Sequence, residues 1–251
     1  MLISLLVFIM LYKRKETDLA VLKWAMLFFF IGEAFCSVNY LIYNDDSYLS
    51  EYIHSSGMVF CFSFFIYAMF EFIDKRIIHF SDMHTRCSLM GLCPDCNKLK
   101  PQTCRLRKLF YLLIMAVIIL SLIPLHAETH AVSYKTEILG TLYSNIHPTL
   151  HQIYEIRILP LFSVLLSLAS LVTLLLKRTN SLAAAKVMFS ASTGALLFSY
   201  FRLVLLDIFI DNLNGFAIWE EFTEFIFIFS VIFILLLWKA VSFPCFDRKT
   251  T

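Results

Sequence analysis

The chain has 251 residues, of which 59% are hydrophobic and only 16% are charged. Soluble domains carry about 25% charged residues, so this composition excludes an ordinary water-soluble globular surface. The formal net charge is only +2 and no basic stripe with interleaved aromatic residues occurs, so no nucleic-acid partner is expected. The length fits one compact domain, and membrane lipid is its expected surroundings.

Seven apolar segments are candidates for membrane-spanning helices. A helix needs about 20 apolar residues to cross the roughly 30 Å hydrocarbon layer of a bilayer. The predicted spans are residues 1–12, 19–43, 52–73, 109–125, 158–176, 183–210 and 216–241. The first is short, and it crosses the layer only if it stands upright; the alternative is a partial or interfacial helix. We therefore expect an all-α membrane protein, a seven-transmembrane helix bundle.

The orientation of this bundle follows from its basic residues, because Lys and Arg favour cytoplasmic loops. With the N-terminus outside, all but three of the 21 Lys and Arg residues fall on the cytoplasmic side. The exceptions are Lys135, Arg157 and Arg202. The prediction is a multi-pass protein of the plasma (inner) membrane with a cytoplasmic C-terminus. Residues 74–108 would form a cytoplasmic loop and residues 126–157 an outer loop.

Four cysteines cluster in the predicted cytoplasmic loop. Cys87, Cys93, Cys96 and Cys104 follow the pattern C-x5-C-x2-C-x7-C. Disulfides are disfavoured in the cytoplasm, and basic neighbours stabilise thiolates, so these residues are candidate metal ligands. Four such sulfurs suit an iron–sulfur cluster or, alternatively, Zn²⁺; a loop without metal is the remaining reading.

The spacing of these cysteines resembles the iron–sulfur loop of the endonuclease III-type DNA glycosylases, which is C-x6-C-x2-C-x5-C. The resemblance covers this loop alone and departs at both outer gaps. It implies an iron–sulfur cluster and carries no implication of DNA repair. No family is recognised over the whole chain.

Ionisable residues inside predicted spans form a second candidate site, because such residues are costly in lipid and usually functional. The set comprises Glu33, Arg202, Asp207, Glu220 and Glu224. Arg202 and Glu224 lie at similar depths on consecutive helices, which predicts an ion pair between them. That pair would either fix the register of two helices or line a polar site toward the outer face. By contrast, Glu71 and Asp74 are expected to be a solvated boundary.

Histidines on the predicted outer side give a third set of candidates. Glu51 and His54 have the spacing of a carboxylate-bridged metal motif, and His151 and Glu155 would share a helix face. These four residues are candidate outer ligands of a metal or a haem. The alternative is that the histidines are ordinary residues of the membrane interface.

The sequence contains no nucleophile elbow, Walker loop, dinucleotide fingerprint or HExxH motif, so a familiar hydrolytic or nucleotide-using enzyme is not expected. The preferred function is a membrane redox protein that exchanges electrons with a cytoplasmic or membrane partner, or reports redox state to it. To carry electrons between the cytoplasmic loop and the outer side, a quinone in the bundle or a partner subunit would have to bridge the layer. One alternative is a seven-helix sensor or receptor-like module with a zinc-stabilised cytoplasmic loop. Another is a structural subunit of a larger membrane complex.

Overall fold

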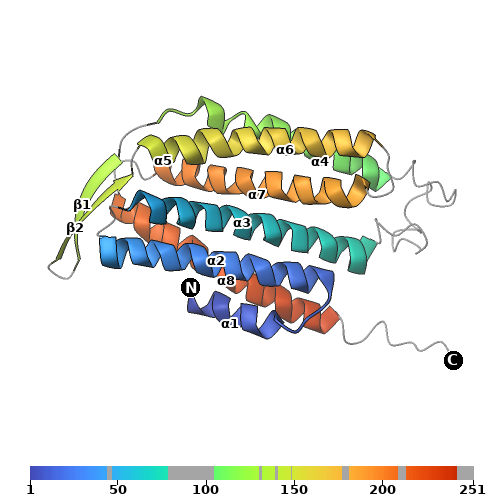
Figure 1. Cartoon of the computed structure of the whole chain (residues 1–251), viewed down its shortest axis with the longest axis horizontal. Coiled ribbons are helices and arrows are strands. Elements are labelled where there is room, and N and C mark those ends of the chain that lie inside the picture. The colour runs from blue at the N-terminus through green and yellow to red at the C-terminus, as the bar shows by residue number, and fades with distance from the viewer. Residues whose placement is uncertain are drawn as a thin grey trace.

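The computed structural model describes residues 1–43, 47–78, 105–129, 132–138, 141–147, 149–176, 181–208 and 213–241. Its helices lie side by side in an elongated bundle, with a β-hairpin at one end, which we call the hairpin end (Figure 1). The helices are α1 (Leu2–Leu11), α2 (Thr17–Tyr43), α3 (Tyr48–Phe72), α4 (Arg105–Ser121), α5 (Thr149–Ile153), α6 (Leu159–Leu175), α7 (Ser181–Ile208) and α8 (Leu213–Val241). Two π-helical segments, η1 (Ile73–Ile78) and η5 (Tyr154–Ile158), continue α3 and join α5 to α6, and a short 3₁₀ turn, η4 (Pro124–His126), follows α4.

Every predicted span contains a helix, and the protein is a membrane-embedded helical bundle. Among the described residues, five helical stretches are long and apolar enough to cross a bilayer: Thr17–Tyr43, Tyr48–Lys75, Leu109–His126, His151–Leu175 and Ser181–Leu205. The ten residues of α1 rise only about 15 Å, half the thickness of the layer. Helix α8 has 29 residues, and three glutamates, Glu220, Glu221 and Glu224, lie in its half nearer to the hairpin end.

The predicted outer loop contains a β-hairpin that the sequence analysis missed. Strand β1 (Val132–Ile138) pairs antiparallel with β2 (Thr141–His147), with Val132 opposite His147 and Ile138 opposite Thr141. The signal was present, because β-branched and aromatic residues alternate along β1 with a period of two. The chain is therefore helical with one two-stranded addition.

Two hydrophobic clusters form the core. The larger joins α1, α2, α3 and α8 with contributions from α6 and α7, and its most deeply buried members include Leu22, Met26, Phe29, Cys61 and Val231. The smaller joins α4, α6 and α7 through Phe110, Ile114, Leu174, Ala185 and Phe189. Large apolar side chains such as Phe222, Phe229 and Phe233 of α8 are exposed, as expected for a surface that faces lipid.

Serine hydroxyls link α4, α6 and α7. Ser163 lies 2.8 Å from Ser121 and 2.9 Å from Ser192, and Ser167 lies 2.6 Å from Ser192, each measured between hydroxyl oxygens. Small residues and interhelical hydrogen bonds hold helices together where lipid removes the hydrophobic drive for association. These hydrogen bonds between serines therefore hold α4, α6 and α7 together.

Two glycine contacts bring helices unusually close. A Cβ added to Gly57 of α3 would lie 2.9 Å from the Cα of Gly32 on α2. One added to Gly194 of α7 would lie 2.5 Å from the backbone nitrogen and 2.6 Å from the Cα of Ser63 on α3. Because these obstacles are backbone atoms, no rotamer change can relieve them.

We expect Gly194→Ala to destabilise the protein by about 1–3 kcal/mol, the usual cost of overpacking a core, although alanine is the better helix former. Thermal unfolding in detergent measures the effect. Gly32→Ala is the matched control, since the backbone oxygen of His54 lies 3.2 Å from its added Cβ and needs only a small shift. Equal stability of Gly194→Ala and the unchanged protein would contradict the close approach of α3 and α7.

Candidate functional site

The predicted cysteine site lies outside the described residues. Cys87, Cys93, Cys96 and Cys104 all fall between residues 79 and 104, so their metal remains a prediction from the sequence. Among the described residues, the side chains with distinctive chemistry are charged groups inside the bundle. They form three groups, two of which are centred on α7.

Helix α7 carries two buried cations, Lys186 and Arg202, each only 3% exposed. They are 16 residues apart in the sequence, which places them about 24 Å apart along the helix. Arg202 lies toward the hairpin end and Lys186 toward the opposite end. A charged group at such depth is stable only with a counter-ion and further hydrogen bonds, so the partners of these cations define the polar sites.

The group at the opposite end joins α7 to α3 and η1. Lys186 Nζ lies 2.6 Å from Glu71 Oε1 and also forms an ion pair with Asp74. Lys75 contacts the other oxygen of Glu71 at 3.0 Å, and the Lys186 ammonium lies 5.4 Å from the centre of the Phe70 ring. The prediction of a solvated boundary at Glu71 and Asp74 is therefore wrong.

The reason for this correction is local geometry. Both carboxylates are buried, because the chain continues past Phe72 as η1 instead of leaving the bundle, and this keeps Asp74 against α7. Glu71 and Asp74 are three residues apart and share one face of this continuous helix, so both reach the same ammonium.

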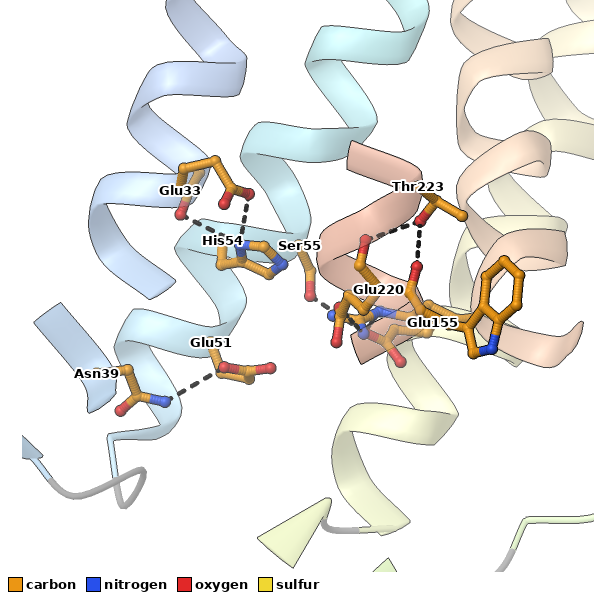
Figure 2. Close-up of polar contacts among 11 residues, drawn as sticks. Glu33, Asn39, Glu51, His54, Ser55, Glu155, Glu220 and Thr223 are labelled. Carbon is orange, nitrogen blue, oxygen red and sulfur yellow. Dashed lines mark hydrogen bonds and ion pairs between the residues drawn. The ribbon is translucent and has the colours of Figure 1, made fainter. Parts of the chain in front are cut away.

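The group toward the hairpin end is centred on Arg202, and Figure 2 labels three of its other members, Ser55, Glu155 and Glu220. Arg202 Nε lies 3.1 Å from Glu155 Oε1, and Arg202 Nη1 forms an ion pair with Glu220. Ser55 donates a hydrogen bond of 3.2 Å to the same oxygen of Glu155. The guanidinium carbon also lies 5.5 Å from the centre of the Phe198 ring.

The expected Arg202–Glu224 ion pair is not the arrangement found, because Arg202 pairs with Glu155 and Glu220 instead. Glu220 is one helical turn closer than Glu224 to the hairpin end of α8. Glu155 lies in η5 and is fully buried, although the sequence analysis placed it in an outer loop. The α5–η5 segment extends α6 into the bundle and so supplies the second carboxylate.

The third group lies beside the second and consists of Glu33 on α2, His54 on α3 and Glu224 on α8. One side-chain ligand atom from each residue lies within 4.8 Å of the other two, and all three residues are buried. His54 Nδ1 is 3.1 Å from the carbonyl oxygen of Gly32 and 3.8 Å from Glu33 Oε1 (Figure 2). Two carboxylates this close repel strongly in apolar surroundings, so the group needs a cation or a shared proton.

The remaining candidate residues lie in separate contacts. Glu51 accepts a hydrogen bond of 3.3 Å from Asn39, which also accepts one of 3.0 Å from the backbone N–H of Ser47 (Figure 2). His151 is buried between Tyr48 and Tyr52, with its ring centre 4.8 Å from that of Tyr52. The four candidate outer ligands thus do not meet at one point. The side chain of Asp207 lies outside the described part of α7.

Comparison of the chain with protein-family models, with curated proteins and with solved structures finds no match. The chemistry of these groups therefore follows from their own geometry. Sequence reasoning identified Glu33, His54 and Glu224 separately, but it assigned them to two different sites. It missed the role of Lys186, for which the only signal was a lysine three residues inside a predicted span.

Proposed function

We propose that the protein is a seven-helix plasma-membrane sensor, with its N-terminus outside and its C-terminus in the cytoplasm. The distribution of Lys and Arg supports this orientation, which puts the hairpin end outside. Helices α1 and α8 complete the seven, and the short α1 crosses by standing upright while the basic residues that follow it extend to the membrane interface. In this role the polar groups near the hairpin end detect a ligand, and the cysteine loop reports to a cytoplasmic partner.

The observation that carries this proposal is the position of the two cations on α7. Arg202 connects α7 to the outer groups through Glu155 and Glu220. Lys186 connects the same helix to Glu71 and Asp74, at the start of the predicted cysteine loop. A change in the outer groups that shifts or rotates α7 therefore acts on the base of that loop.

Coupling between distant sites requires an element with two arrangements that both sites influence. Small translations of a helix are a common form of such a change. In this protein α7 is that element, and the two ion-paired groups are its contacts at either end. Zinc on the four cysteines would give the loop a fixed shape that a partner can bind.

The test is the reactivity of the loop cysteines toward a membrane-impermeant maleimide. In sealed inside-out vesicles the loop should be labelled, whereas in intact cells it should be protected. Glu220→Gln removes one partner of Arg202 and should change the labelling rate by about twofold or more, which corresponds to a coupling free energy of roughly 0.5 kcal/mol. Lys186→Met should abolish that response, because it disconnects α7 from the base of the loop.

Glu221→Gln is the matched control, since it removes an exposed carboxylate next to Glu220 on the same helix. It should leave the labelling rate unchanged. Labelling of the loop in intact cells would show that it faces outward and would contradict the proposed orientation. Identical labelling rates in Glu220→Gln and the unchanged protein would refute the coupling through α7.

The cysteine spacing favours a second function, a redox protein with an iron–sulfur cluster on the loop. The two functions differ in the metal, because iron with acid-labile sulfide and a brown colour indicates a cluster, whereas colourless protein with zinc indicates the sensor. A redox protein would also need a quinone or a partner subunit to carry electrons across the layer. Metal analysis and the visible spectrum of protein purified without oxygen distinguish them.

A further inference from the structure

We propose that Glu33, His54 and Glu224 bind a divalent transition-metal cation, Zn²⁺ in the first instance. Imidazole nitrogen and carboxylate oxygen are both ligands of Zn²⁺, and water would complete the coordination around these three. The role of this ion as the signal that the sensor detects rests on the proposed function. The binding site itself rests on the geometry of its three ligands.

An unsatisfied oxygen points to a ligand at this position. Glu33 Oε1 is buried and has no hydrogen-bond partner, and the Glu33 side chain is only 9% exposed. Nδ1 of His54 is 3.8 Å from this oxygen, beyond hydrogen-bonding distance. A buried carboxylate oxygen without a partner is costly, and a bound cation removes that cost.

The protonation of His54 fits a metal ligand. A carbonyl oxygen can only accept a hydrogen bond, so the contact with Gly32 places the proton of the neutral ring on Nδ1. The lone pair then lies on Nε2, the nitrogen through which His54 would coordinate the ion. Histidines that bind metals characteristically donate their other N–H to a backbone carbonyl or a carboxylate in this way.

The backbone around the ligands is held rigidly. Gly32 and Gly57 bring α2 and α3 into close contact next to Glu33 and one turn from His54. The His54 backbone oxygen would lie only 3.2 Å from a Cβ at Gly32, so the two ligands lie where their helices pack closely. Ligand spacing set by packed backbone is the arrangement that a preorganised metal site requires.

The charges also favour a dication. Arg202, the nearby cation, is already paired with Glu155 and Glu220. With neutral His54, the two carboxylates of the group carry a formal charge of −2 when ionised, and a divalent ion balances this charge without a further partner. Protons shared between the carboxylates are the competing solution, and the experiment below distinguishes the two.

Zinc binding should be measured on the full chain in nanodiscs after removal of metal with EDTA. To eliminate binding by the loop, the four cysteines are first changed by Cys87→Ser, Cys93→Ser, Cys96→Ser and Cys104→Ser. Equilibrium dialysis should then give one Zn²⁺ per chain. Glu33→Gln, His54→Gln and Glu224→Gln should each weaken binding by about 100-fold or more, at or beyond the upper end of losses seen for residues that only support metal ligands.

Glu221→Gln is the control, because it removes a charge from α8 three residues before Glu224 but outside the group. A second measurement uses Co²⁺, whose visible absorption should show nitrogen and oxygen ligands in the folded protein with its three ligands intact. Failure to bind Zn²⁺ and absence of the Co²⁺ bands would each overturn the site, as would unchanged affinity in the ligand variants. These results are independent of maleimide labelling, so the metal site and the coupling through α7 can fail separately.

Discussion

Replacing Lys186 with methionine should reduce the stability of the protein by about 3–5 kcal/mol, the typical cost of removing one partner of a buried ion pair. The methionine has a similar length and fills the space, so the loss reports charge rather than volume. Glu71 and Asp74 are at most 5% exposed at their side chains, and without Lys186 their charges lose the buried cation between them. Unfolding in a mixed detergent and denaturant series measures the change in free energy.

Lys75→Met is the matched control for this experiment. Lys75 also contacts Glu71, at 3.0 Å, but its side chain is 48% exposed, and an exposed pair contributes only about 0–1 kcal/mol. The triple variant Lys186→Met, Glu71→Gln and Asp74→Asn should recover much of the lost stability, because no uncompensated buried charge remains. Equal losses in Lys75→Met and Lys186→Met would show that water reaches this group.

Arg202→Met should cost a similar amount, about 3–5 kcal/mol, because it leaves the fully buried Glu155 without its guanidinium partner. Arg202→Lys should recover only part of the loss. A lysine offers a single charged nitrogen, whereas the guanidinium uses separate nitrogens for Glu155 and Glu220. The same unfolding assay compares the two variants.

The double variant Arg202→Met with Glu155→Gln should be more stable than Arg202→Met alone, and this difference is the sign of a buried pair. Arg202→Met with Glu224→Gln is the parallel comparison. It should recover little, since Glu224 belongs to the group with Glu33 and His54. The opposite order of stability in the two double variants would contradict the Arg202–Glu155 pair and support the Arg202–Glu224 pair expected from the sequence.

The helical spans could be predicted from sequence because lipid imposes a simple rule, a continuous apolar stretch of sufficient length. Arg202 and Glu224 stood out as ionisable residues inside such stretches, where a charged group needs a partner. This rule could not identify the partners of Arg202, because Glu155 comes from η5, before α6, and because depth alone does not choose between Glu220 and Glu224 on α8. Chain connectivity favoured α8 as the partner of α7, whereas packing also brings Glu155 from η5 to Arg202.

The group of Glu33, His54 and Glu224 illustrates the same limit. Each residue was a candidate on its own, but Glu33 and Glu224 were assigned to an intramembrane site and His54 to outer ligands. They meet because α2 and α3 approach closely at Gly32 and Gly57. Glycines in a helix indicate that close packing can occur there, but not which helix will approach.

The charges of α7 also bear on how the protein enters its membrane. Of the five apolar stretches among the described residues, that of α7 is the least hydrophobic. In its most apolar 18-residue segment 56% of the residues are buried, against 28–33% in the corresponding segments of the others. A lysine or arginine in an inserting helix is costly, by about 2.5–3.5 kcal/mol at the helix centre and less toward its ends. Glu71, Asp74 and Glu155 are synthesised before α7, so carboxylates for both of its cations are already in place when it leaves the ribosome. Helix α7 is therefore expected to insert against its neighbours rather than alone into lipid, and only Glu220 joins it afterwards.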